Sequence, residues 1–213
     1  MPTRTAGGLT GLATGAGLFL ATLPAAAATI FVEDFDAENG GASQLNYSGF
    51  AQFTVARTAV DLIASGGFGI TCAGGAGACV DLDGSNSQAG LIESIGIGLV
   101  AGTAYELRFD VSGNQRTGAT DSMLYGITGG QFAGGPITKA GGDPFETIVA
   151  GFTATATGTF SIFFDHAGGD NIGLILDNVS LASIDGTTPV PLPASLPLLA
   201  LGLGAIGLAR RRI

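Results

Sequence analysis

The feature that most constrains the fold is a strict alternation of side chains between residues 103 and 111. Large apolar side chains take every second position, and small or charged side chains take the positions between them. A strand points successive side chains to opposite faces of a sheet, so a period of two is typical of a strand buried on one face. We therefore predict a strand whose inward face carries Tyr105, Leu107, Phe109 and Val111.

Two other segments share this period. Their predicted inward positions are Phe160, Ile162 and Phe164 in the first, and Ile175, Val179 and Leu181 in residues 173–181. Shorter apolar runs predict further strands at residues 30–35, 50–55, 59–63, 79–82, 122–127 and 147–153. Residues 90–100 are also assigned to strand, although a helical spacing of their apolar residues competes and two glycines interrupt it.

Glycine accounts for 37 of the 213 residues, which disfavours long helices. Each glycine in a helix interior costs about 1 kcal/mol relative to alanine, whereas turns accept glycine readily. Many short strands joined by Gly, Asn and Asp turns are typical of a β-sandwich rather than a βαβ fold. We assign residues 29–186 to one all-β sandwich domain.

The N-terminus has the features of a signal peptide covering residues 1–28. Arg4 supplies a positive charge, an apolar stretch follows, and Pro24 ends it just before three small residues, Ala26 to Ala28. This order is typical of a segment that signal peptidase removes during export. The cleavage site is expected after Ala28 or a residue or two earlier.

The C-terminus carries a second, three-part signal within residues 187–213. It begins with the motif Val190, Pro191, Leu192, Pro193 and Ala194, continues with an apolar run to residue 209, and ends with Arg210, Arg211 and Arg212. Residues 190–209 are just long enough to cross a bilayer core of about 30 Å as a helix. The arginines act as a stop-transfer signal and predict a cytoplasmic C-terminus.

This order of motif, span and arginine cluster resembles the VPLPA variant of the PEP-CTERM sorting signal. The resemblance implies that an exosortase-type membrane enzyme recognises residues 190–194 and cuts near them. The protein would then be anchored only transiently in the inner membrane and pass to the cell surface or an exopolysaccharide matrix. A plain C-terminal membrane anchor is the alternative.

Charge narrows the class of partner. Residues 29–189 hold all 17 acidic residues and only four basic ones, a formal net charge of −13. Such a field repels a phosphate backbone, so nucleic acid is excluded as a partner. The same charge suits solubility outside the cell and is compatible with divalent cations.

Cys72 and Cys79 are the only cysteines, and a Gly/Ala segment separates them. An exported chain meets an oxidising compartment, which favours a disulfide over half of a zinc site. Closing so small a loop contributes roughly 2–3 kcal/mol in the chain-entropy estimate. We predict a disulfide that holds this glycine-rich hairpin together.

Three short motifs follow one another in the middle of the chain. They are VDLDG at residues 80–84, GTAYELRFD at residues 102–110 with Gly113 and Asn114, and GLILDNV at residues 173–179. In this order they resemble the galactose-binding-like jelly roll of many carbohydrate-binding modules. The resemblance implies an antiparallel two-sheet jelly roll, often with a structural calcium ion. Its ligands would be Asp36 and Asp177, with solvated surface carboxylates as the alternative.

Three functions remain open at this level. The leading one is a non-catalytic surface or matrix protein associated with exopolysaccharide. The second is a specific carbohydrate-binding module, with or without calcium. Tyr47 and Tyr125 are its candidate stacking residues, because tryptophan is absent and Tyr105 points inward. A hydrolase is disfavoured: His166 is the sole histidine, no G-x-S-x-G motif occurs, and Asp165-His166 suits a strand end.

Overall fold

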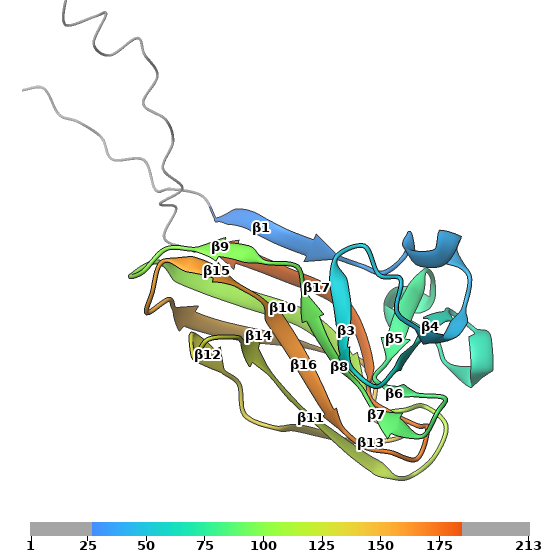
Figure 1. The fold of residues 1–213 in the computed structure, drawn as a ribbon. Coiled ribbons are helices and arrows are strands. Elements are labelled where there is room, and N and C mark those ends of the chain that lie inside the picture. Colours follow the sequence, from blue (N-terminus) through green and yellow to red (C-terminus); the bar gives the residue numbers. More distant parts are fainter. Residues whose placement is uncertain (1–26, 185–213) are drawn as a thin grey trace, which may run out of the picture.

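The computed structural model describes residues 27–184, which form two antiparallel β-sheets packed face to face (Figure 1). Sheet A has the order β14-β10-β17-β5-β4-β2, and β1 also pairs with β17. Its strands are β1 (Ala28–Glu33), β2 (Gln44–Tyr47), β4 (Val60–Ala64), β5 (Ala78–Asp81), β10 (Ala104–Ser112), β14 (Glu146–Thr153) and β17 (Ile175–Ser183).

Sheet B has the order β12-β11-β16-β8-β3, and β13 also pairs with β11. Its strands are β3 (Phe53–Arg57), β8 (Leu91–Ser94), β11 (Thr120–Ile127), β12 (Phe132–Ala133), β13 (Ile137–Ala140) and β16 (Ile162–Ala167). Two short ladders complete the strands: β9 (Ile97–Leu99) with β15 (Gly158–Phe160), and β6 (Asp83–Gly84) with β7 (Gln88–Ala89). The predicted antiparallel jelly-roll sandwich is therefore confirmed.

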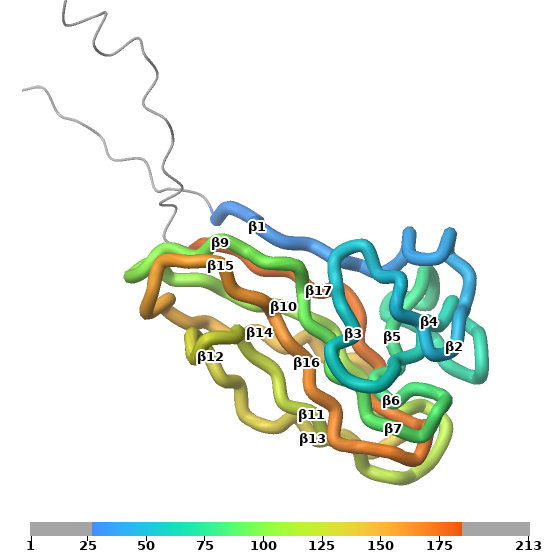
Figure 2. The backbone as a smooth tube through the Cα atoms, in the orientation of Figure 1, coloured from blue at the N-terminus to red at the C-terminus, as the bar shows by residue number. Residues whose placement is uncertain are grey.

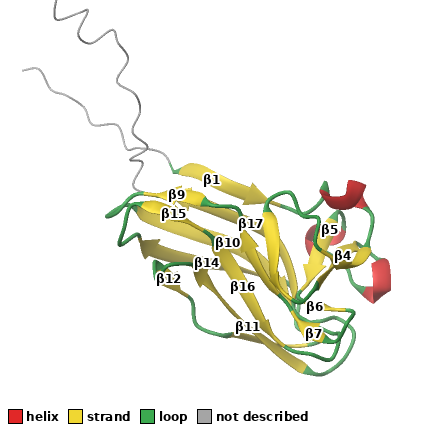
Figure 3. Ribbon diagram, viewed as in Figure 1, coloured by secondary structure: helices red, strands yellow, loops and turns green. Residues whose placement is uncertain are grey.

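Helical structure in the described part is confined to three 3₁₀ turns, in keeping with the glycine content (Figure 3). They are η1 (Glu38–Gly41), η2 (Gly67–Gly69) and η3 (Ala73–Gly75). Among residues 27–184, no helix has the length and apolar character needed to span a membrane. Most of the predicted signal peptide (residues 1–26) and the sorting tail from residue 185 onward lie outside the described residues.

The core lies between the sheets and is rich in aromatic rings. The alternation in β10 is confirmed, because the side chains of Tyr105, Leu107, Phe109 and Val111 are all buried. The Phe109 ring contacts Phe164 of sheet B edge to face, with centroids 5.0 Å apart. Such pairs add stabilisation beyond their buried area, so the two predicted inward faces meet at the centre of the sandwich.

The prediction for β17 is wrong in one respect. Ile175 does not share a face with Val179 and Leu181; it packs outside sheet A against the disulfide, whereas Leu176 is in the main core. The register to β10 shifts within β17, and Asn178 there has a positive φ of 51°. Asparagine tolerates this conformation better than most residues, and the resulting bulge exchanges the two faces of the strand.

The first and last described strands end side by side. Ala28 pairs with Ser183, so β1 starts where β17 finishes. In Figure 2 this end of the sandwich lies beside β9 and β15, and the β6–β7 hairpin lies at the opposite end. The points where the chain enters and leaves the sandwich are therefore remote from the β6–β7 end.

Candidate functional site

A groove of about 720 Å³ opens on the outer face of sheet B, near the β6–β7 end of the sandwich. It is lined by the ends of β3 and β16, the β6–β7 turn, the first half of β11 and Pro136. Its lining includes polar side chains that point outward together with one exposed leucine: Arg57, Ser87, Gln88, Ser122, Leu124 and Asp165.

An ion pair lines the groove. Arg57 donates through Nη2 to Asp165 Oδ1 and, at 3.3 Å, to the carbonyl oxygen of His166. Both residues lie directly opposite Leu91 of β8, one on each neighbouring strand. The long arginine side chain therefore reaches over β8 to the carboxylate, and both charged groups stay partly open to solvent.

Local backbone geometry shapes the rim of the groove. Thr58 and Ser87 both have positive φ values, 53° and 57°, and each turns the chain at the rim. Thr58 Oγ1 also donates to the carbonyl oxygen of Ala89 at 2.6 Å, which ties the end of β3 to β7. The β3–β4 connection and the β6–β7 hairpin are thus fixed against each other.

Below the groove lies a buried polar cluster built from two of the sequence motifs. Asp83 Oδ2 accepts hydrogen bonds from the amides of Gly169 and Asp170, at 2.6 and 3.0 Å. His166 Nε2 accepts one from the amide of Leu174 at 3.2 Å. These contacts hold the loop of residues 168–174 over the end of the sandwich, so the predicted strand end at His166 is where this loop begins.

The protonation of His166 follows from these contacts. Burial lowers the pKa of the imidazole, against the opposing effect of the nearby Asp83 carboxylate. In the neutral ring Nε2 is the acceptor, so the proton is on Nδ1. A Ser–His nucleophile pair needs the accepting nitrogen to face a hydroxyl, whereas here it faces a main-chain amide. The geometry thus gives no support to a Ser–His nucleophile pair at His166.

Asp81 forms the other half of this cluster. Its Oδ1 accepts from the amides of Asp83 and Gly173, at 3.1 and 2.9 Å, and its Oδ2 pairs with Arg116. Burial raises the pKa of Asp81 to about 7, and the amides and the guanidinium oppose that rise. Asp81, which is buried, and Arg116, which is partly buried, therefore form a structural pair, and neither lines the groove.

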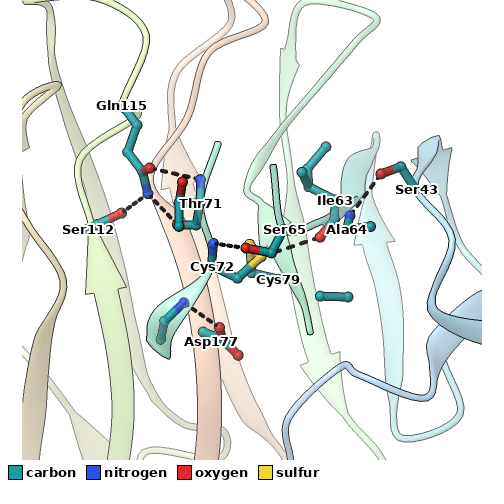
Figure 4. Close-up of a disulfide and its surroundings, with 12 residues drawn as sticks. Ser43, Ile63, Ala64, Ser65, Thr71, Cys72, Cys79, Ser112, Gln115 and Asp177 are labelled. Atoms are coloured by element: carbon teal, nitrogen blue, oxygen red, sulfur yellow. Dashed lines mark hydrogen bonds between the residues drawn. A yellow bond between two sulfur atoms is a disulfide. The ribbon is translucent and has the colours of Figure 1, made fainter. Parts of the chain in front are cut away.

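The disulfide between Cys72 and Cys79 is confirmed (Figure 4). Asp177 lies beside it, with a carboxylate oxygen within 4.8 Å of both sulfur atoms. Asp177 Oδ2 accepts the amide of Ala73 at 3.0 Å, and Asp36 Oδ1 accepts the amide of Ala78 at 2.8 Å. The two predicted calcium ligands thus hold the two ends of the disulfide hairpin.

This arrangement is a poor set of donors for calcium. Both oxygens of Asp177 accept main-chain amides, the second from Asn178 at 2.8 Å, and the side-chain ligand atoms grouped with it among the described residues are the two disulfide sulfurs. Calcium prefers six to eight oxygen ligands. Burial, followed by weaker repulsion from Asp36 and Asp110, raises the pKa of Asp177 to about 7. The calcium site stays a prediction, and solvated surface acid is the wrong description of Asp177, which is buried.

The tyrosine prediction is wrong. Tyr47 and Tyr125 are both buried in the main core, where Tyr125 meets Phe109 edge to face at 4.9 Å. Neither ring can therefore stack on a sugar. Tyr105 points inward as predicted, and its hydroxyl accepts the amide of Val100 at 3.0 Å.

Comparison with known proteins gives structural neighbours and no family. No protein-family model and no curated protein matches the sequence. Similar solved structures include the C-terminal CBM6 of a marine laminarinase from Zobellia galactanivorans, which is 12% identical, with 66% of this chain and 98% of that chain covered and a TM-score of 0.40.

Two others are likewise carbohydrate-binding domains. The CBM22-1–CBM22-2 tandem from Paenibacillus barcinonensis Xyn10C is 9% identical, with 82% of this chain and 50% of that chain covered and a TM-score of 0.48. The N-terminal cellulose-binding domain of Cellulomonas fimi β-1,4-glucanase C is 22% identical, with 57% of this chain and 88% of that chain covered and a TM-score of 0.38. Similarity at this level carries no information on what the present chain binds.

Sequence reasoning missed the two charged residues of the groove. Asp165 could have been placed on the outer face, because it alternates with the inward residues Ile162 and Phe164 of the same strand. Arg57 is one of only four basic residues between positions 29 and 189. Their contact joins positions 108 residues apart, and no local pattern encodes it.

Proposed function

We propose that this protein is an exported, non-catalytic β-sandwich that binds neutral polysaccharide through the groove on sheet B. The observation that carries the proposal is the Arg57–Asp165 pair, which lines an open groove among hydroxyl and amide side chains. A guanidinium offers several donors in one plane and a carboxylate offers two acceptors. Adjacent sugar hydroxyls both donate and accept, so they can bridge such a pair.

The remaining lining fits the same ligand class. Leu124 is 49% exposed and offers an apolar surface for the C–H face of a sugar ring. Gln88 and Ser122 add polar groups around it. Because no aromatic platform is present in this lining, we expect weak binding per site, and the net charge of −13 disfavours acidic polymers.

Affinity electrophoresis of the full-length chain, kept soluble in a non-ionic detergent, tests the groove. We expect gels containing soluble neutral polysaccharides to retard the wild type. The double variant Arg57→Ala/Asp165→Ala should weaken that retardation by at least about tenfold, since the groove loses both charge-assisted hydrogen-bonding groups. Parallel runs with calcium and with a chelator show whether an ion contributes.

A matched control exists on the other sheet. Arg108 and Glu106 form a similarly exposed ion pair on the outer face of sheet A, outside the groove. The double variant Arg108→Ala/Glu106→Ala should bind like the wild type. The proposal is contradicted if all three proteins are retarded equally. It is also contradicted if no neutral polysaccharide retards the wild type.

We also propose that the chain is sorted to the cell surface by its two terminal signals. The resemblance of residues 190–213 to the exosortase signal supports this, and so does the position of the groove. The groove lies at the β6–β7 end of the sandwich, and the start of β1 and the end of β17 lie at the other end, so both points of attachment are remote from the groove.

Intact-mass measurement of the protein recovered from the cell surface checks the sorting proposal. We expect the mature chain to lack residues 1–28 and the segment that follows the Val190–Ala194 motif. Replacing Pro191 and Pro193 by alanine should leave the full tail in place and hold the protein in the membrane fraction. A surface form that retains Arg210–Arg212 indicates a plain anchor instead.

A further inference from the structure

Strand β14 forms a long free edge of sheet A. It pairs with β10 over residues 146–153 in a continuous register without a bulge. In an antiparallel ladder, every second residue directs its N–H and C=O groups away from the neighbouring strand. Within the part of the chain that the structure describes, these outward groups of β14 meet no partner strand.

The sequence of this edge does not protect it. Residues 147–153 read TIVAGFT, with no charge and no proline, and Val149 on the outer face is 49% exposed. Natural edge strands are usually blocked by lysine, proline, bulges or short length, because an open edge accepts another strand. β14 has none of these within its last seven residues, 147–153.

The other edges of the two sheets do carry such protection. β1, β2 and β3 each contain a register irregularity, and the Gln52 side chain also donates to the carbonyl oxygen of Val32 in β1 at 2.6 Å. The edge formed by β12 and β13 consists of two short strands with Pro136 between them. Among the described edge strands, β14 is thus the long, regular and unblocked one.

We propose that β14 pairs with β14 of a second copy of this chain, antiparallel and about a two-fold axis at Ala150. This register places Ile148 opposite the partner's Phe152, a large apolar pair on the inward face. On the outer face Val149 meets the partner's Gly151, and Thr147 meets the partner's Thr153. Large side chains thus meet small or complementary ones throughout, and the two A sheets become one continuous sheet.

Charge favours a second copy at this edge over any other position. The net charge of −13 on residues 29–189 makes two copies repel each other over most of their surface. β14 is uncharged between residues 147 and 153, and Glu146 at its start is paired with Lys139 at 3.0 Å.

The two-fold axis is perpendicular to the sheet, so the grooves of both copies face the same side. The dimer can therefore bind one polymer at two points, which rests on the proposed function of the groove.

Sedimentation of the full-length chain in a non-ionic detergent tests this. We expect a reversible dimer. Val149→Lys should raise its dissociation constant by at least about tenfold, because lysine blocks natural edge strands. Val32→Lys is the matched control, since Val32 is 51% exposed on the outer face of β1 at a protected edge. It carries the same substitution and the same tail, and should leave the dimer unchanged.

Cross-linking tests the register separately. Mixed Thr147→Cys and Thr153→Cys proteins should form an intermolecular disulfide under mild oxidation, whereas each variant alone should not, because position 147 faces position 153 of the partner. A wild type that stays monomeric overturns the proposal. Slow amide exchange in residues 147–153 of such a monomer would show that another segment of the same chain covers the edge. Equal effects of the two lysine variants also overturn the proposal.

Discussion

Replacing Arg116 with methionine should lower the free energy of unfolding by roughly 3 kcal/mol at pH 8.5, because it leaves a buried carboxylate without its partner. Asp81 is 1% exposed, and its Oδ2 has Arg116 as its ionic partner. Methionine keeps much of the volume but cannot compensate the charge. Urea unfolding of variant and wild type, compared through the change in midpoint at constant slope, measures the loss.

The loss should shrink to about 1 kcal/mol at pH 5.5, where Asp81 is protonated and only the hydrogen bonds from the guanidinium to uncharged acceptors are missing. The pKa of Asp81 is raised from 3.8 to about 7 in the folded state. A raised carboxyl pKa means that the native state binds a proton more tightly than the unfolded state does. The stabilisation that comes from protonated Asp81 is therefore complete below pH 4 and is lost as the pH rises through 7.

Other groups complicate the pH profile of the wild type itself. The pKa of Asp177 is raised like that of Asp81, so Asp177 also stabilises the fold at low pH and loses this effect as the pH rises. Burial lowers the pKa of His166, so its contribution to stability is lost as the pH falls through 6.5. The difference between variant and wild type largely cancels both contributions. Arg108→Met is the control: its pair with Glu106 is solvent-exposed, and its loss should stay within about 0.5 kcal/mol at either pH. A loss for Arg116→Met that does not change with pH contradicts the assignment.

For several acidic residues the structure shows a role that the overall charge does not indicate. A net charge of −13 on residues 29–189 suggests solvated surface carboxylates. In the structure several of these carboxylates are buried and accept main-chain amides of loops: Glu33, Glu38, Asp61, Asp81, Asp83 and Asp177. Glycine-rich loops expose many amides, and a buried carboxylate satisfies two or more of them at once.

The strands were predictable where the alternation was long and regular. In β10 and β16 the inward faces follow directly from the period of two. The same rule could have corrected the tyrosine prediction, because Tyr125 alternates with the inward residues Met123 and Ile127. It fails in β17, where the bulge at Asn178 exchanges the faces and no neighbouring residue signals it.

The groove lies beyond the reach of local patterns for a different reason. Its ion pair depends on β3 and β16 both flanking β8, which is a property of strand order. Several strands that complete sheet B, such as β12 and β13, are too short to produce a periodic signal. Residue alternation thus predicts which side of a strand a group occupies, and only the topology determines which groups meet there.

The second large effect is expected at Phe164. Its ring is fully buried and packs against the rings of Phe109 and Phe53, with ring centroids 5.0 and 6.3 Å away, so it joins both sheets at the centre of the core. Phe164→Ala should cost about 3–5 kcal/mol in the free energy of unfolding, through lost burial and the cavity that remains. The midpoint of thermal unfolding should fall by roughly 10 °C for a domain of this size.

The neighbouring residue is the control for this prediction. Phe163 belongs to the same strand and has the same side chain, but it is only partly buried, on the outer face of sheet B. Phe163→Ala should cost about 1 kcal/mol, since much of its ring already meets solvent. A shift of one residue in strand register exchanges the two faces. Similar costs at both positions, or a larger cost at Phe163, therefore contradict the register of β16 and, with it, the outward position of Asp165 in the groove.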